Sequence, residues 1–219
     1  MTAHSTPPRW PAGIVDRVDG RPGMVALTFD DGPNVTATAQ VREILNGHGV
    51  RATFFEVGKA LESRPSLALD LLRDGHVIAN HSHSHSLAAW LSRDDDDLSR
   101  AQDAFAQHLG VRPAFFRPPF GLVTRETRQR LKEHGMTCVT WDVAAEDWKL
   151  DDPAEIARRV LEAVRPGSIV LLHDGHDGDV TGNRHVIVEA LPAILAGLAA
   201  RSLAPAGLDD LIETRPYLE

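Results

Sequence analysis

The sequence has few of the features that mark several common classes of protein. Its 219 residues include one cysteine, Cys138, so no disulfide framework can form, and this thiol lies in an apolar run typical of a core position. No apolar run is long enough to cross a membrane. The net charge of -8 argues against a basic surface for nucleic acid. We therefore expect no nucleic-acid partner, no membrane partner and a monomeric chain.

Residues 1–23 are rich in proline and glycine and contain no hydrophobic run of signal-peptide length. As written, the chain is expected to be cytoplasmic, or secreted if a leader has been removed. We interpret this segment as an N-terminal arm, with Trp10 at an edge of the core. Residues 24–219 are long enough to form one domain with a sizeable core.

Apolar runs alternate with amphipathic segments along the rest of the chain. Strands are predicted at residues 24–30, 50–57, 76–80, 114–116, 136–141 and 168–172. Helices are predicted between and after them, at residues 36–48, 65–73, 98–109, 123–134, 153–164 and 184–200. Strands separated by helices imply a parallel sheet, and this many right-handed crossovers favour closure. The expected fold class is an α/β barrel, with six clear strands and a weak seventh.

The first strand ends in two adjacent carboxylates, Asp30 and Asp31, followed by Gly32-Pro33. The residues of Asp-Gly-Pro-Asn are common in turns, so a simple turn is one interpretation. Two neighbouring carboxylates in a partly dry site raise one another's pKa unless a cation lies close by. The motif alone leaves turn and site open.

Polar residues follow the other apolar runs in the same way. They are His81 and His85 after the third strand, Arg117 after the fourth, Asp147 after the fifth and His173 after the sixth. The carboxyl ends of parallel strands share one rim of a barrel, so these side chains can converge on one site. This pattern favours the site over the simple turn.

His81 and His85 stand four residues apart, a spacing that places two imidazoles on one side of a helical turn. With Asp31 they supply two histidines and one carboxylate, which leaves positions open for water and substrate as in catalytic zinc sites. A tract of three histidines in five residues also binds metal adventitiously. We expect His83 to point the other way, toward the pocket wall or behind its neighbours.

Two further segments are rich in possible metal ligands. Residues 94–97 are four consecutive aspartates before a helical run, and we interpret them as a solvated helix start that complements the helix dipole. Residues 173–179 combine histidine, aspartate and glycine, and we interpret them as a solvated loop at the rim rather than a second metal site.

Five motifs occur in order: Thr-Phe-Asp-Asp-Gly-Pro at 28–33, Asn-His-Ser-His-Ser-His at 80–85, Arg-Pro-Pro-Phe-Gly at 117–121, Trp141 with Asp-Trp at 147–148, and Leu-Leu-His at 171–173. They resemble the motifs of the polysaccharide deacetylase family, carbohydrate esterase family 4, also called the NodB-homology domain. The resemblance covers residues 24 to 205. It implies a distorted, TIM-barrel-like (β/α)7 barrel and makes residues 24–219 a single catalytic domain.

The resemblance also implies an activity. The family comprises metal-dependent hydrolases of carbon-nitrogen bonds other than peptide bonds. Their substrates carry N-acetylglucosamine units, as in chitooligosaccharide, chitin or peptidoglycan. By resemblance, Asp31, His81 and His85 match the metal ligands, for Zn2+ or alternatively Co2+ or another divalent ion. Asp30 matches the general base that takes a proton from the attacking water, and Arg117 matches the residue that pairs with this base.

The remaining roles concern the leaving group and the acetyl group. His173 matches the general acid that protonates the leaving amine, and Asp147 matches the carboxylate that orients it. The backbone N–H of Phe120 is expected to stabilise the oxyanion, and the same residue borders the substrate site. Trp148 and Leu171 match the walls of the acetyl pocket.

The sequence departs from the family pattern at two positions. Phe120 stands where the family usually has tyrosine, so a hydroxyl that might contact sugar is missing. Ala144 stands where the fourth motif usually has its first aspartate, and Asp142 is nearby but out of register. All the expected metal ligands, the base and the acid are present, so we expect activity to survive.

Several alternative functions remain open from sequence. The same fold acts in some relatives on cyclic amides or on acetyl esters such as those of xylan. Two histidines and a carboxylate also describe non-haem Fe(II) oxygenases, although the α/β periodicity does not fit their usual scaffold. A non-catalytic sugar-binding module is a further alternative, disfavoured by Asp30 and His173. The scarcity of aromatic residues predicts few sugar subsites and a short substrate.

Overall fold

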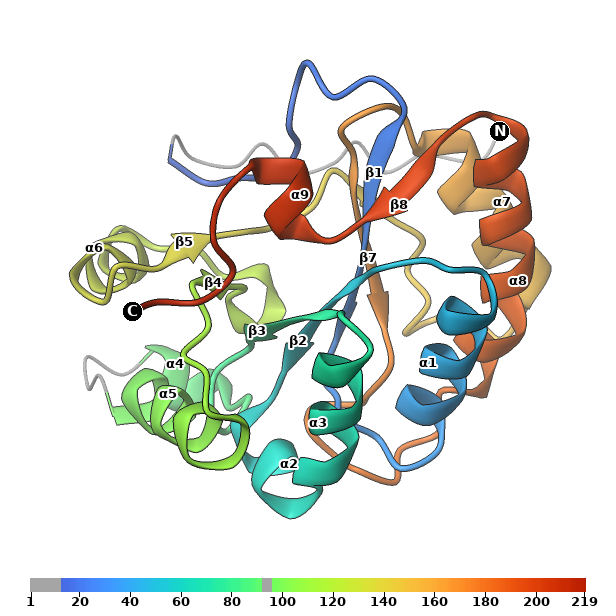
Figure 1. Ribbon diagram of the computed structural model, residues 1–219. Helices are drawn as coiled ribbons and strands as arrows, with labels where there is room; N and C mark the ends of the chain where they lie inside the picture. Colours follow the sequence, from blue (N-terminus) through green and yellow to red (C-terminus); the bar gives the residue numbers. More distant parts are fainter. Residues whose placement is uncertain (1–12, 92–95) are drawn as a thin grey trace.

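The computed structural model describes residues 13–91 and 96–219 (Figure 1). Its strands form one parallel sheet in the order β5-β4-β3-β2-β1-β7-β6, with β8 paired to β1. The strands are β1 Met24–Asp30, β2 Thr53–Glu56, β3 Val77–Asn80, β4 Phe115–Phe116, β5 Thr137–Cys138, β6 Val143–Ala144, β7 Ile169–His173 and β8 Ala204–Ala206. The predicted α/β class and barrel-like architecture are confirmed, with the sheet curled around the centre of the molecule.

Helices cover the outer side of this sheet (Figure 1), except α9 (Leu208–Ile212), whose Leu208 and Leu211 pack with residues that face the inside of the barrel. The helices are α1 Ala37–Gly47, α2 Gly58–Ser63, α3 Pro65–Arg73, α4 Leu87–Leu91, α5 Asp96–Leu109, α6 Arg125–Glu133, α7 Pro153–Ala163, α8 His185–Ala200 and α9 Leu208–Ile212, with a 3-10 turn at Pro119–Gly121. Among the residues that the structure describes, no helix combines the length and apolar character needed to span a membrane.

Both faces of the central strand β1 are buried, which explains its continuous apolar run. Val25, Leu27 and Phe29 pack with the outer helices in the largest hydrophobic cluster. Ala26, between them, faces the inside of the barrel and packs in a second cluster with Phe55 of β2. The residues of β1 after Met24 are thus inaccessible to solvent except where the strand ends at the site.

The described part of the N-terminal arm lies across the gap between the two ends of the sheet. Val15 forms a bridge with Val139, just after β5, and Arg17 forms a bridge with Ser168, just before β7. The backbone N–H of Val18 donates to the carbonyl of Gly167 over 2.9 Å. The arm therefore covers the open seam of the barrel, whereas Trp10 lies outside the described residues.

The predicted strand at 136–141 is wrong in extent. Only β5, Thr137–Cys138, pairs with β4, and β6, Val143–Ala144, pairs with β7 at the other end of the sheet. Thr140 between them donates its N–H to Val15 of the arm. The chain crosses the seam of the barrel here, so β5 and β6, which are close in sequence, lie at opposite edges of the sheet. The segments α2, α4 and α9 are too short to have produced a periodic signal.

Candidate active site

The register of the sheet brings the candidate residues to one rim. Asp30 at the end of β1 lies level with His173 at the end of β7, and Asn80 at the end of β3 lies level with the end of β4. The residues that follow β3 and β4 are His81 and Arg117. They surround a pocket of about 400 Å3 lined by Asp30, Asp31, His81, His85, Pro118, Phe120, Gly121, Trp141, Trp148, Leu171, His173, His176, Asp177 and Arg184. The convergence predicted from the strand ends is therefore present.

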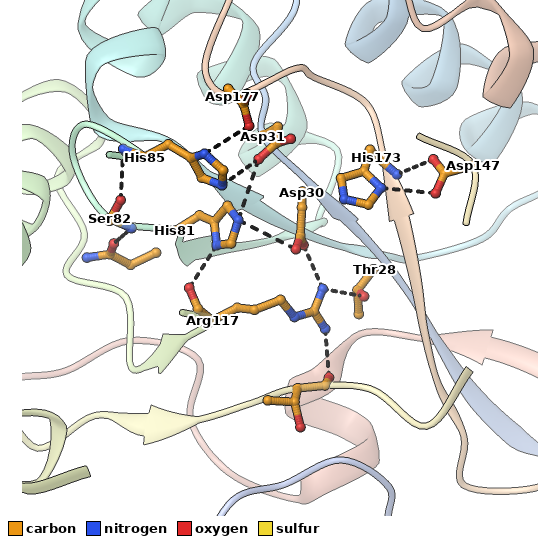
Figure 2. A network of polar contacts seen from close by, with 12 residues as sticks. Thr28, Asp30, Asp31, His81, Ser82, His85, Arg117, Asp147, His173 and Asp177 are labelled. Carbon is orange, nitrogen blue, oxygen red and sulfur yellow. Dashed lines mark hydrogen bonds and ion pairs between the residues drawn. The ribbon is translucent and has the colours of Figure 1, made fainter. Parts of the chain in front are cut away.

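Asp30 and Arg117 form an ion pair inside the barrel (Figure 2). Nη1 of Arg117 donates to Oδ1 of Asp30 over 2.6 Å and to Oγ1 of Thr28 over 2.8 Å. Its Nη2 donates to the carbonyl of Thr140 over 2.9 Å, and the guanidinium lies 4.0 Å from the centre of the Phe55 ring. Sequence reasoning missed Thr28, whose hydroxyl fixes the side of the guanidinium that faces Asp30.

Asp31, His81 and His85 converge on one point (Figure 2). Nε2 of His81 lies 3.5 Å and Nε2 of His85 lies 3.2 Å from Oδ1 of Asp31. Two ligands that are each about 2.1 Å from one tetrahedral ion are roughly 3.4 Å apart, so these separations fit a shared metal. Oδ1 of Asp31 is buried and makes no hydrogen bond, as expected of an atom reserved for a cation.

The protonation states of Asp31 and His85 also suit a cation, whereas, against the effect of burial, Asp30 and Asp31 raise the pKa of the third member, His81. Burial and the neighbouring His81 lower the pKa of His85 to about 4, so its ring is neutral at neutral pH and can act as a ligand. Burial would raise the pKa of Asp31, but the three histidines around it hold its pKa below the usual value. The carboxylate is therefore ionised.

The two histidines do not share a helical turn, and that prediction is wrong. Ser82 has a φ of 69° and His85 a φ of 52°, both in the left-handed region. Ser82 donates its N–H to Oδ1 of Asn80, and His85 donates its N–H to the Ser82 hydroxyl. Nδ1 of His81 lies 2.7 Å from the carbonyl oxygen of Arg117, which fixes the ring with Nε2 toward Asp31. A loop held by side-chain hydrogen bonds replaces the helix.

His83 points away from the pocket and does not form its wall; its Nε2 lies 3.1 Å from a carboxylate oxygen of Glu62. Asp97 lies in the first turn of α5, but the prediction that it is solvated is wrong, because the residue is 8% exposed. Its carboxylate accepts hydrogen bonds from the backbone N–H groups of His83 and Ser84, over 3.2 and 3.1 Å. Asp97 thus supports the loop between the two site histidines, while residues 94–95 lie outside the described part.

His173 is held by Asp147 through two contacts (Figure 2). The backbone N–H of His173 donates to Oδ2 of Asp147 over 2.9 Å, and its Nδ1 lies 3.0 Å from Oδ1. Burial would lower the pKa of His173, but Asp147, and less strongly Asp31 and Asp30, raise it to about 9. The imidazole is therefore protonated at neutral pH, with Nε2 on the side away from Asp147.

The expected substrate-binding residues line the same pocket. The Trp148 ring packs edge-on against His173, with 5.1 Å between ring centres, and Leu171 lies at the inner wall. Phe120 has a φ of 58° and packs its ring 4.7 Å from that of His85. Within the described part of the chain, no residue accepts a hydrogen bond from the Phe120 N–H. This donor is thus free for a substrate oxygen.

Asp142 does not replace the aspartate missing at Ala144. Its carboxylate accepts hydrogen bonds from the backbone of Ile169 and the hydroxyl of Ser168, near the start of β7 and away from the rim. Ala144 lies on β6 and pairs with Leu171. The contact between Asp147 and His173 is therefore made without a second aspartate.

The loop after β7 is solvated at Asp177 as predicted, since its side chain is 58% exposed, but this aspartate also contacts a candidate metal ligand. Its Oδ1 lies 3.0 Å from Nδ1 of His85, on the opposite side of the ring from Asp31 (Figure 2). The loop approaches so closely that a Cβ on Gly175 would lie 2.1 Å from the carbonyl oxygen of Asp31. Sequence reasoning missed Asp177, although the glycines around it indicated a loop that packs tightly.

A parallel α/β barrel whose strand ends bring together an Asp-Arg pair, a His-Asp pair and an Asp-His-His set has the architecture of barrel hydrolases. The comparisons with known proteins are specific about which hydrolases these are. Residues 17–139 match the polysaccharide deacetylase family. The chain belongs to this family, as the five motifs predicted.

Two relatives and one solved structure show how far the similarity extends. The chitooligosaccharide deacetylase of Azorhizobium caulinodans is 32% identical over 203 residues, covering 88% of this chain and 96% of that protein. The peptidoglycan-N-acetylglucosamine deacetylase of Bacillus cereus is 32% identical over 192 residues, covering 87% of this chain and 68% of that protein. The crystal structure of a peptidoglycan N-acetylglucosamine deacetylase in complex with 4-naphthalen-1-yl-N-oxidanyl-benzamide superimposes with a TM-score of 0.86 at 28% identity, covering 93% of this chain and 94% of that one.

The chain is shorter than some other relatives. It spans 34% of the peptidoglycan-N-acetylmuramic acid deacetylase of Bacillus subtilis that it matches and 32% of the peptidoglycan-N-acetylglucosamine deacetylase of Listeria monocytogenes.

The buried ion pair leads to a prediction about stability. Replacing Arg117 with alanine leaves Asp30 buried without its partner, so we expect the free energy of unfolding to fall by about 3–5 kcal/mol. Urea denaturation of the purified variant measures this. Arg112→Ala is the matched control, because its pair with Asp103 is exposed at the surface and is worth less than about 1 kcal/mol. Equal losses in the two variants would contradict the importance of the buried pair.

The environment of His173 leads to a prediction about pH. Asp147→Asn removes the main interaction that raises the pKa, so the pKa should fall by about one unit or more and the ring should lose its proton at lower pH. NMR titration of the His173 ring measures this shift. The control is Asp142→Asn, whose carboxylate contacts the other end of β7, and which should leave the titration in place. An unchanged titration in the Asp147 variant would refute the assignment.

Proposed function

We propose that this protein is a metal-dependent deacetylase that hydrolyses the N-acetyl group of N-acetylglucosamine units in chitooligosaccharide, chitin or peptidoglycan. One observation carries the proposal: a buried Asp-His-His set lines the same pocket as Asp30, which forms an ion pair with Arg117, and as the protonated His173. The names of the relatives from Azorhizobium caulinodans and Bacillus cereus support the choice of substrates.

The proposed metal is Zn2+, with Co2+ or another divalent ion as alternatives. Asp31, His81 and His85 would hold it, since one carboxylate and two imidazoles are a common zinc donor set that leaves positions open. Such an ion would polarise the acetyl carbonyl and make a bound water more acidic. The chain's own residues then account for the movement of protons.

Asp30 is the proposed general base. It lies beside the Asp-His-His set, with Oδ2 3.6 Å from Nε2 of His81, and can accept a proton from the attacking water. The guanidinium of Arg117 binds its other oxygen, Oδ1. Arg117 therefore holds the base in place and leaves its other oxygen, Oδ2, on the side of His81.

His173 is the proposed general acid that donates a proton to the leaving amine. Asp147 occupies Nδ1 and fixes the ring, so the proton to be transferred is the one on Nε2. The free N–H of Phe120 is placed to donate to the oxyanion that develops from the acetyl oxygen. Trp148 and Leu171 are the proposed walls against which the acetyl methyl group packs.

Acetate release from N-acetylchitooligosaccharides tests this function. We expect the protein treated with chelator to be inactive, and added Zn2+ or Co2+ to restore activity. Asp30→Asn should lower the metal-restored rate by about 100-fold or more, because a neutral amide cannot accept the proton. Asp142→Asn is the control, since it removes a buried carboxylate that lies outside the pocket. Release that is independent of metal, or equal in the Asp30 variant, would overturn the mechanism. Release from acetylxylan or a cyclic amide alone would assign the same chemistry to another substrate.

The contact between Asp177 and His85 leads to a separate prediction about metal affinity. A carboxylate against Nδ1 orients a ligating imidazole and increases its basicity, so Asp177→Asn should weaken Zn2+ binding by about 10- to 100-fold. Competition with a chromophoric chelator measures the dissociation constant without any substrate. Asp179→Asn is the matched control two residues along, because its carboxylate contacts Thr181 instead of the site. Equal affinities in the two variants would show that Asp177 does not act on the ligand.

A further inference from the structure

Arg184, immediately before α8, is nearly buried yet lines the candidate pocket. The residue is 7% exposed, and its Nε donates to the carbonyl of Gly175 over 2.6 Å. Gly175 itself lies against the backbone of Asp31. The guanidinium is therefore fastened to the loop that packs on the Asp-His-His set.

The terminal amino groups of Arg184 have no partner among the residues that the structure describes. The bond to Gly175 is its one hydrogen bond there, and no acidic side chain forms an ion pair with it. The fully buried side-chain atoms without a hydrogen-bond partner do not include Nη1 or Nη2 of Arg184. Both nitrogens are therefore accessible to solvent. Arg117, the other buried arginine near the site, has Asp30 as its counter-ion. Arg184 has none.

Among residues 13–91 and 96–219, no other permanent cation borders the pocket. Its lining residues in the described part of the chain include no lysine and no arginine besides Arg184. His176 also lines the pocket but is 61% exposed in its side chain and faces Asp177 at 3.7 Å. A nearly buried guanidinium without a counter-ion is costly unless an anion or water satisfies it, and the pocket is where that partner can enter.

The remaining donors define the shape of the anion. Because Nε is occupied by Gly175, Nη1 and Nη2 form the free end of the fork, which matches the two oxygens of a carboxylate. A pocket of about 400 Å3 is the size of a small-ligand site, so the carboxylate must belong to the reacting sugar or to its immediate substituent.

We propose that Arg184 is a specificity-determining anion subsite for an N-acetylated sugar that carries a carboxylate close to its acetamido group. The lactyl ether of N-acetylmuramic acid has this chemistry, because the ring carbon next to the acetamido carbon carries the ether oxygen of the lactyl group, whose other end is the carboxylate. This inference rests on the proposed function, because it assigns a substrate class to the same pocket. Arg184 would bind the substrate without contacting the reacting atoms; those contacts are the role of the residues described above.

Binding of N-acetylmuramic acid and of its methyl ester to the Zn2+-loaded protein tests this proposal. The two ligands differ in charge at one group, and calorimetry measures both dissociation constants. We expect the wild type to bind the acid about 10-fold or more tightly than the ester. Arg184→Gln should bring that ratio close to one, and Arg184→Lys should give an intermediate ratio, since it keeps the charge without the fork.

Several results would overturn the subsite. They are equal binding of acid and ester by the wild type, absence of binding by either, a ratio that persists in Arg184→Gln, and equal weakening of both ligands, which would make Arg184 only a support for the loop. Free acetate that binds with the same dependence on Arg184 would show that the site serves the product's carboxylate, not the sugar's. Thermal unfolding of the Gln variant verifies that it is folded.

Acetate release measured on the same samples separates this inference from the proposed function. Discrimination between acid and ester without any acetate release would support the subsite and refute the deacetylase. Release from N-acetylchitooligosaccharides without discrimination would support the deacetylase and refute the subsite.

Discussion

The buried pair of Asp30 and Arg117 is the interaction on which the rest of the site depends. Its members lie on β1 and just after β4, which are separated in the sheet by β2 and β3. The arginine reaches Asp30 only because the sheet curls, so that its side chain crosses the interior over Phe55. Two charges are stable there only as a pair with satisfied hydrogen bonds, and Thr28 and Thr140 supply the additional partners. The curl of the sheet is therefore needed both for the fold and for the ion pair that holds the proposed base.

The same rim must also accommodate an excess of carboxylates. Behind the turn after Asp31, Glu56 and Asp174 are fully buried and face each other around Gly32, where a Cβ would lie 2.6 Å from Oδ2 of Asp174 and 2.9 Å from Oε2 of Glu56. Burial and Asp174 raise the pKa of Glu56 well above its usual value, and burial raises that of Asp174 to about 7. Protonation of this pair limits the negative charge behind Asp31, and glycine at position 32 makes the approach possible.

How much the sequence predicts depends on what positions each residue. Residues at strand ends were predictable, because a parallel barrel gathers the ends of its strands whatever its loops do; Asp30 and His173 are examples. Residues in loops were not, because their side chains are directed by contacts distant in sequence. Asp97 lies in the first turn of a helix as predicted, but its carboxylate is buried and accepts a hydrogen bond from the backbone of His83. Asp177 is exposed as predicted, but it also contacts His85. The prediction of a helical turn at His81 was wrong for the same reason. Side-chain hydrogen bonds within the loop determine its backbone conformation, and the four-residue spacing of the histidines does not.

One short segment after β7 connects three properties that are usually considered separately. His173 begins it as the proposed acid, the carbonyl of Gly175 holds Arg184, and Asp177 contacts His85. Gly175 lies too close to the backbone of Asp31 for a side chain, so the segment cannot shift without moving all three contacts. The proposed proton donation by His173, metal binding through His85 and anion recognition by Arg184 therefore all depend on the position of this one segment.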